Sequence, residues 1–166
     1  MKMNYKKLVF LLGIAVILSS AAHAQTYKYI GATKCKMCHN KPDKGEQYTK
    51  WENSPHAKAF ETLKSKGEEN NPKCLKCHST AASIDNSLNG GIKVEEGVSC
   101  EGCHGPGSVY RNIAIMKNKE KALASGLVMP DEKVCKTCHN EESPNYKGFD
   151  FKTYVAKIAH DDPTTN

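Results

Sequence analysis

The chain lacks a long hydrophobic run and a basic stripe, and each absence excludes a class of protein. Its longest apolar run, at residues 8–18, is shorter than the roughly 20 residues that cross a bilayer. The net charge of +6 falls to +3 without Lys2, Lys6 and Lys7, and the remaining lysines are interspersed with glutamates and form no basic stripe with interleaved aromatic residues. We therefore expect neither stable membrane insertion nor nucleic-acid binding.

The first 24 residues have the three-part build of a secretory signal. Three lysines precede the apolar run, and Ala22, His23 and Ala24 form an A-x-A cleavage site. We expect one mature domain at residues 25–166, located in the periplasm or secreted. The residue directly after the cleavage site is Gln25 and not a cysteine, which argues against a lipid anchor there.

No cysteine lies outside a CxxCH pentapeptide. Two thiols three positions apart on one helical turn can each bond one vinyl group of a haem, and the adjacent imidazole then reaches the iron as proximal ligand. The pattern predicts four covalently attached haem c groups. The attachment cysteines are Cys35, Cys38, Cys74, Cys77, Cys100, Cys103, Cys135 and Cys138, and the proximal iron ligands are His39, His78, His104 and His139.

Two other interpretations of the cysteines are a disulfide framework and zinc sites. Neither requires a histidine directly after every CxxC pair, and zinc sites combine one pair with a second pair or with separated histidines. Haem attachment explains both cysteines, their spacing and the histidine of each motif, and is the preferred interpretation.

The sequence is too polar to build four ordinary hydrophobic cores, since its mean hydropathy is −0.60. The porphyrin faces must then supply much of the buried apolar surface. The predicted fold class is mainly α with extensive irregular chain, a small multihaem c-type cytochrome fold packed around four covalently bound haems. Folding should depend on haem, as small metallodomains depend on their metal.

Start and stop signals predict several short elements. Ser54 and Pro55 are typical of an N-cap and a first helical position, which would place His56 in the first turn. Asp150 is expected to cap the last helix, and Gly126 to follow the end of another. The expected helices cover residues 43–50, 54–66, 108–125 and 151–160, with a brief strand at 92–94.

Distal iron ligands are scarce. Apart from the four motif histidines, only His56 and His160 follow the signal. At least two of the four irons therefore need another kind of distal ligand or stay open. We predict that both histidines bind iron; the alternatives are an exposed histidine at a helix start for His56, and a complement to the helix dipole for His160. Met116 is the candidate distal ligand that is not a histidine; the alternative is that its side chain only packs in the core. Histidine–methionine ligation would raise the potential of that haem.

Two segments, WENSPHAKA at 51–59 and GVSCEGCHGPG at 97–107, together with the order of the four motifs, resemble the tetrahaem cytochrome c-554 family. The resemblance covers nearly all of the mature chain. It implies a periplasmic electron carrier that accepts electrons from hydroxylamine oxidoreductase, with three bis-histidine haems and one five-coordinate haem.

Matched residue by residue, the resemblance implies that His56 is the distal ligand of the third haem and His160 that of the fourth, with the haem at His78 open. The family's distal histidine for the first haem follows the CHGPG segment, whereas residues 110–121 contain no histidine. Met116 would replace it, or the first haem is open as well.

Together these observations predict a protein that carries single electrons through four haems between two redox partner proteins. We do not expect an enzyme, because the sequence offers no acid/base pair for catalysis. Two alternatives stay open. In the first, the protein is a reductase whose open iron at His78 reduces nitric oxide, nitrite or hydroxylamine. In the second, the protein self-associates into an extracellular haem filament, and a neighbouring copy supplies the missing histidines.

Overall fold

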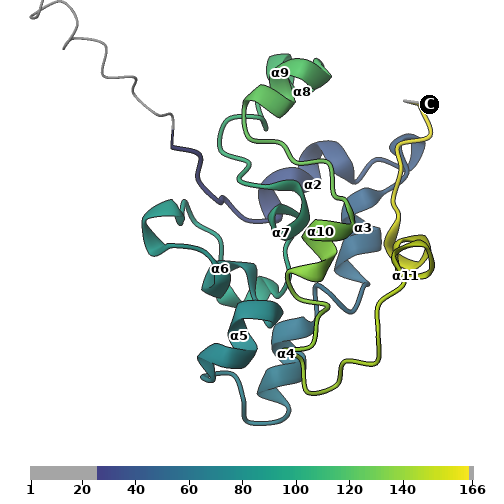
Figure 1. Cartoon of the computed structure of the whole chain (residues 1–166). Coiled ribbons are helices and arrows are strands. Elements are labelled where there is room, and N and C mark those ends of the chain that lie inside the picture. The colour runs from purple at the N-terminus through teal and green to yellow at the C-terminus, as the bar shows by residue number, and fades with distance from the viewer. Residues whose placement is uncertain (1–25, 165–166) are drawn as a thin grey trace, which may run out of the picture.

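The computed structural model describes residues 26–164, and the predicted signal at 1–24 lies outside this range. Short helices are joined by long irregular segments (Figure 1). Within the described residues no strand forms, and the β pairing is a bridge between Tyr29 and Asn89, so the predicted class is confirmed. The elements are α2 (Thr33–His39), η1 (Pro42–Lys44), α3 (Gln47–Glu52), α4 (Ala59–Lys64), α5 (Pro72–His78), α6 (Thr80–Ser83), η2 (Asn86–Leu88), η3 (Val94–Glu96), α7 (Cys100–His104), α8 (Ile113–Met116), α9 (Lys119–Ala124), α10 (Glu132–Lys136) and α11 (Phe151–Ile158).

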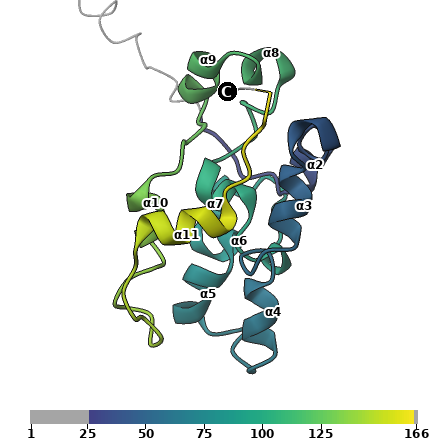
Figure 2. The ribbon, with the colours of Figure 1, turned by 90° about the vertical axis from the view of Figure 1, so that its right-hand side faces the viewer.

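The helices form two ends with further helices between them. At one end α4 packs against α5, and α5 against α6; at the other, α8 packs against α9. Figures 1 and 2 place α2, α3 and α7 between these ends. This arrangement brings segments that are far apart in the sequence close to the CxxCH helices.

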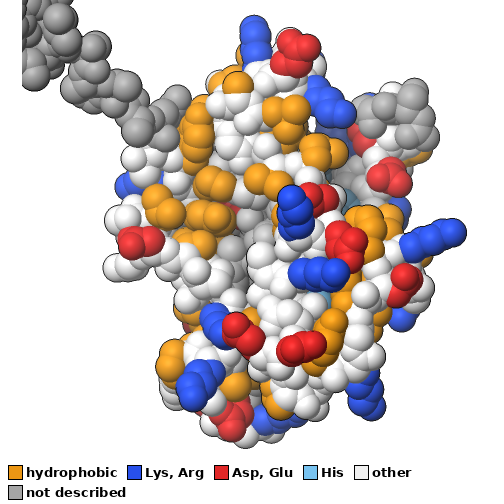
Figure 3. Space-filling view, viewed as in Figure 1, with side chains coloured by type: hydrophobic (Ala, Val, Ile, Leu, Met, Phe, Trp, Pro, Cys, Tyr) orange, Lys and Arg blue, Asp and Glu red, His pale blue; other side chains and the backbone are white. Residues whose placement is uncertain are grey.

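The packed core is small for a chain of this length. It contains three alanines, and its larger members come from separate elements rather than from one continuous layer. On the face in Figure 3, Lys and Arg side chains are interspersed with Asp and Glu. The buried hydrophobic residues are Ala32, Tyr48, Ala59, Leu63, Ile92, Tyr110 and Ala122.

The last helix begins where the sequence predicts. The Asp150 carboxylate accepts a hydrogen bond from the Thr153 backbone N–H at 2.7 Å, which satisfies one of the free donors at the start of α11. The helix ends at Ile158 rather than at residue 160. His160 therefore lies beyond the helix, on the segment that follows it.

The helix predicted at 54–66 begins only at Ala59, and this part of the prediction is wrong. Residues 53–58 form turns, so His56 precedes the helix instead of lying in its first turn. A distant segment explains the difference, because the Val98 N–H donates to the His56 carbonyl at 2.9 Å. His56 is thereby attached to the residues that lead into the third motif.

The single helix predicted at 108–125 is divided into α8 and α9. Asn112 and Asn118 interrupt it, because each side-chain oxygen accepts a backbone N–H two or three residues ahead, at 2.9 Å in both cases. Gly126 follows α9 as predicted. Two further predictions are wrong: residues 43–50 are covered by η1 and α3, and residues 92–94 form no strand but lead into η3. No helix within residues 26–164 is long and apolar enough to span a bilayer.

Candidate haem-attachment and iron-ligation sites

The first three CxxCH motifs lie on short helices, and the fourth begins on one. The helices α2, α5 and α7 all end at the motif histidine, and α10 carries the first cysteine of the fourth motif. Residues at i and i+3 share one helix face, so both thiols of a motif point to the same side. All eight cysteines are free thiols, available for two thioether bonds per motif.

Two of the motif histidines are held by backbone carbonyls. The Nδ1 of His78 lies 3.0 Å from the Ala59 carbonyl oxygen, and the Nδ1 of His104 lies 3.2 Å from that of Val128. An Nδ1–H that donates to a carbonyl leaves Nε2 unprotonated and directed away, which is the usual arrangement of a metal-binding imidazole. These contacts orient His78 and His104 as the prediction of proximal ligation requires.

Two further histidines face motif histidines. The ring centres of His56 and His139 are 6.0 Å apart with the planes at 75°, and those of His104 and His160 are 6.0 Å apart at 76°. With metal–nitrogen bonds of about 2 Å and ring centres roughly 1 Å further back, two imidazoles on one metal have centres about 6 Å apart. The residues therefore fit an iron held between each pair.

The pairing is opposite to the one implied by the family resemblance. His56 faces His139 of the fourth motif, and His160 faces His104 of the third. The expectation that His56 serves the third haem and His160 the fourth is thus corrected. The physical reason is chain routing, because the segment after α11 returns to α7 whereas His56 lies in the turn before α4.

The His56–His139 pair is supported on one side by aromatic rings. Phe149 stacks on His139 with ring centres 5.1 Å apart and planes at 26°. Tyr154, on α11, lies 5.7 Å from the same imidazole and 4.8 Å from Phe149. Such packing fixes the orientation of the His139 ring.

Burial keeps these imidazoles neutral. It is the leading cause that lowers the pKa of His39, His56, His104 and His139 below the usual 6.5. For His56 the neighbouring His139 lowers the pKa further, and for His104 the neighbouring His160 does so. Neutral imidazole is the form that binds a metal, so the environment favours ligation.

The cysteines of different motifs approach one another in two places. Cys35 hydrogen-bonds with Cys100, which is the main cause of a lowered pKa at Cys35 and a raised pKa at Cys100. Burial, followed by the neighbouring Cys138, raises the pKa of Cys77 to about 11. The first motif therefore lies against the third, and the second against the fourth.

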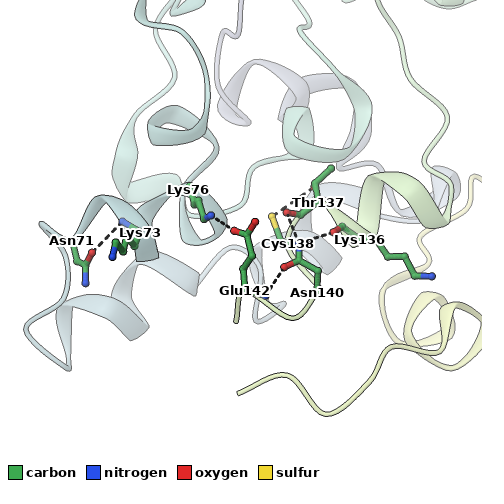
Figure 4. Close-up of polar contacts among 8 residues, drawn as sticks. All are labelled: Asn71, Lys73, Lys76, Lys136, Thr137, Cys138, Asn140 and Glu142. Carbon is green, nitrogen blue, oxygen red and sulfur yellow. Dashed lines mark hydrogen bonds and ion pairs between the residues drawn. The ribbon is translucent and has the colours of Figure 1, made fainter. Parts of the chain in front are cut away.

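An ion pair and an amide fix the second and fourth motifs to each other. Lys76, within the second motif, pairs with Glu142 (Figure 4). Asn140 donates to the carbonyl oxygens of Lys136 and Thr137 at 2.9 and 3.1 Å, and its side-chain oxygen accepts from the Glu142 N–H at 2.9 Å. The turn after the fourth motif thus presents Glu142 to Lys76.

For the first motif the structure supplies no second histidine within the described residues. His39 lies near His160, which lowers its pKa, and near Asp162, which raises it, but burial has the largest effect. Met116 ends α8, which packs against α9, and its side chain is half-buried. Ligation by Met116 therefore stays a prediction.

Sequence reasoning missed the residues that orient the histidines. The carbonyls of Ala59 and Val128 carry no side-chain signal, because any residue supplies a carbonyl. Phe149 lies close to the capping residue of α11, but its position gives no hint of stacking on His139. Glu101, inside the third motif, is fully buried, and a charged residue between two attachment cysteines was a signal that the sequence did offer.

Four CxxCH motifs, carbonyl-oriented imidazoles and two opposed histidine pairs together define a multihaem c-type cytochrome. A model of the family described as cytochrome c554 and c-prime matches residues 34–105, which contain the first three motifs. The chain is 28% identical to cytochrome c-554 of Nitrosomonas europaea, over 80% of this chain and 66% of that relative. The chain is thus similar to cytochrome c-554, and its four CxxCH motifs carry four covalently attached haem c groups.

A solved structure agrees with the fold. The reduced state of cytochrome c554 from Nitrosomonas europaea matches with a TM-score of 0.57 and 24% sequence identity, covering 83% of this chain and 86% of that one. At this identity the match concerns the fold. The present chain spans 66% of the curated relative's length.

Proposed function

We propose that this protein is an electron carrier of the periplasm, which accepts single electrons from one redox partner protein and delivers them to another. The bound haems supply reversible one-electron chemistry at iron. The chain itself supplies the attachment thiols, the axial imidazoles and the contacts that hold them. Four haems attached to one small chain would give electrons several successive sites between two docking partners.

The single observation that carries this proposal is the pair of opposed histidines at the third and fourth motifs. His104 faces His160, and His56 faces His139, so each pair would hold a haem iron from both sides and leave it no free position for a substrate. A metal with both axial positions filled by protein exchanges electrons without binding a substrate, which is the property of a carrier. The resemblance to cytochrome c-554 agrees with it.

The contacts around the pairs favour small structural change during electron transfer. The imidazoles of His78 and His104 are held by carbonyls at 3.0 and 3.2 Å, and Phe149 stacks on His139. Side chains held in this way keep the same positions in both oxidation states, and a preorganised site needs little reorganisation. Location in the periplasm is supported by the signal-like residues 1–24.

The experiment measures electron capacity and catalysis on the same holoprotein. The fully reduced protein is titrated with a one-electron oxidant, and it is also incubated with excess reductant and nitrite, hydroxylamine or nitric oxide. We expect about four oxidising equivalents per chain, one per haem, and no sustained consumption of the three small molecules. Sustained turnover of any of these molecules would contradict the carrier proposal and show that the protein is a reductase.

A further inference from the structure

Glu101 is a buried carboxylate that the proposed ligation does not use. It lies between the two cysteines of the third motif, yet only 1% of its surface is exposed. A carboxylate in such a position must be compensated by hydrogen bonds or by a positive charge. The ion pairs of residues 26–164 involve other carboxylates. Burial raises the pKa of Glu101, and backbone hydrogen bonds oppose this effect by favouring the ionised form.

Backbone N–H groups from two separate segments hold this carboxylate. The Ile30 N–H contacts both oxygens, at 3.0 and 2.9 Å. The Gly31 N–H donates to Oε2 at 2.8 Å, and the Gly107 N–H donates to Oε1 at 2.6 Å. Because both oxygens accept and neither donates, the hydrogen-bond pattern is that of an ionised carboxylate.

The position of Glu101 joins the first motif to the third. Ile30 and Gly31 immediately precede α2, which carries the first motif, whereas Glu101 lies on α7 within the third. Next to it in the sequence, Cys100 contacts Cys35 of the first motif. The mutual contact of Cys35 and Cys100 and their burial have the largest effects on the pKa of each thiol. The negative charge of Glu101 has a smaller effect, and it raises the pKa of both.

We propose that Glu101 sets the reduction potentials of the haems attached at the first and third motifs, through a buried negative charge fixed between their attachment segments. This rests on the proposed function, since it assumes that the motifs carry electron-transferring haems. A fixed negative charge in a medium of low dielectric stabilises ferric over ferrous iron and lowers the potential. Glu101 is a positioning residue in this scheme, because it acts on the haems without binding their iron.

The test compares Glu101→Gln with Glu95→Gln in the haem-loaded protein. Glu95 is exposed and lies in η3, close to the third motif, so the control removes the same charge from a solvated site. Intact-mass measurement first counts the haems, and spectropotentiometry then resolves the four potentials. We expect Glu101→Gln to raise two of them, with about a tenfold change in each reduction equilibrium, equivalent to about 59 mV, and Glu95→Gln to change them far less.

A fully haemylated Glu101→Gln protein whose potentials match those of Glu95→Gln would overturn the proposal while leaving the carrier function intact. A wild-type protein that contains no haem would instead contradict the proposed carrier function itself. If Glu101→Gln alone loses haem, the potentials are read in Glu101→Asp, which keeps the charge. Restored haem content with wild-type potentials supports the proposal; potentials raised there, or haem lost there too, would make side-chain shape the property that matters.

Discussion

The imidazoles of His56 and His139 face each other with 6.0 Å between their ring centres, although they come from the turn before α4 and from the fourth motif. No local pattern in the sequence relates these two positions. Their approach results from the fourth motif lying against the turn before α4. The same relationship between His104 and His160 suggests that the fold builds two complete iron sites from four separate segments.

Replacing either distal histidine should open one iron. In the haem-loaded protein we expect His56→Ala to convert one haem of four from low spin to high spin, because the iron held by His139 loses its second imidazole. His160→Ala should do the same to a different haem, the one held by His104. Electron paramagnetic resonance of the oxidised proteins counts the converted haems.

The two variants control each other. The double variant should show two converted haems, since the pairs share no ligand, and the potentials that rise should differ between the single variants. Conversion of the same haem by both substitutions, or of none, would be incompatible with the two pairs described above.

Gly97 positions His56 without contacting its side chain. An added Cβ would lie 2.7 Å from the carbonyl oxygens of both His56 and Ala57, and the backbone has φ +64°. We expect Gly97→Ala to lower the free energy of unfolding by about 1–3 kcal/mol and to produce a fraction of high-spin fourth haem, measured by chemical denaturation and by electron paramagnetic resonance.

Gly67→Ala is the matched control for this substitution. Gly67 has a similar φ of +70°, but no atom lies within 4 Å of the added Cβ. It should share the backbone penalty and leave the spin state unchanged. Equal effects of both variants on the spin state would show that Gly97 does not position His56.

Acid should destabilise the protein before its carboxylates titrate. Burial lowers the pKa of His56, His104 and His139 below 6.5, so below that pH the unfolded chain binds more protons than the folded one. The free energy of unfolding then falls as the pH drops through this range, and iron ligation by neutral imidazole acts in the same direction. Guanidinium unfolding, followed by the haem absorbance, should give a lower midpoint at about pH 5 than at pH 7.5. A midpoint that is constant or higher at about pH 5 would contradict this account.

The chain should not fold without haem. Its buried hydrophobic residues include Ala32, Ala59 and Ala122 and few large side chains, which is too little apolar surface to offset the entropy of ordering the backbone. When the protein is produced without haem attachment, circular dichroism should show little helix and no cooperative thermal transition. A sharp transition in the unloaded chain would mean that the polypeptide core is sufficient.

The attachment sites could be predicted from the sequence because a CxxCH motif is local: its five residues form one turn, whatever lies around them. The capping of α11 by Asp150 is local in the same way. The pairing of His56 and His160 with their motifs could not be predicted, because it depends on where the segments after α11 and before α4 pack. The division of the helix at 108–125 has a signal in the sequence, since Asn112 and Asn118 both favour caps over helix interiors, whereas the apolar spacing of the segment favours one continuous helix.

The number of bis-histidine haems tests the central claim most directly. Electron paramagnetic resonance of the oxidised, monomeric holoprotein should show two low-spin haems of the bis-histidine type, because the chain after residue 24 has six histidines and four of them are proximal. The remaining two haems should have other signatures. Three or four bis-histidine signals in the monomer, or none, would contradict the assignment of His56 and His160 to the fourth and third motifs.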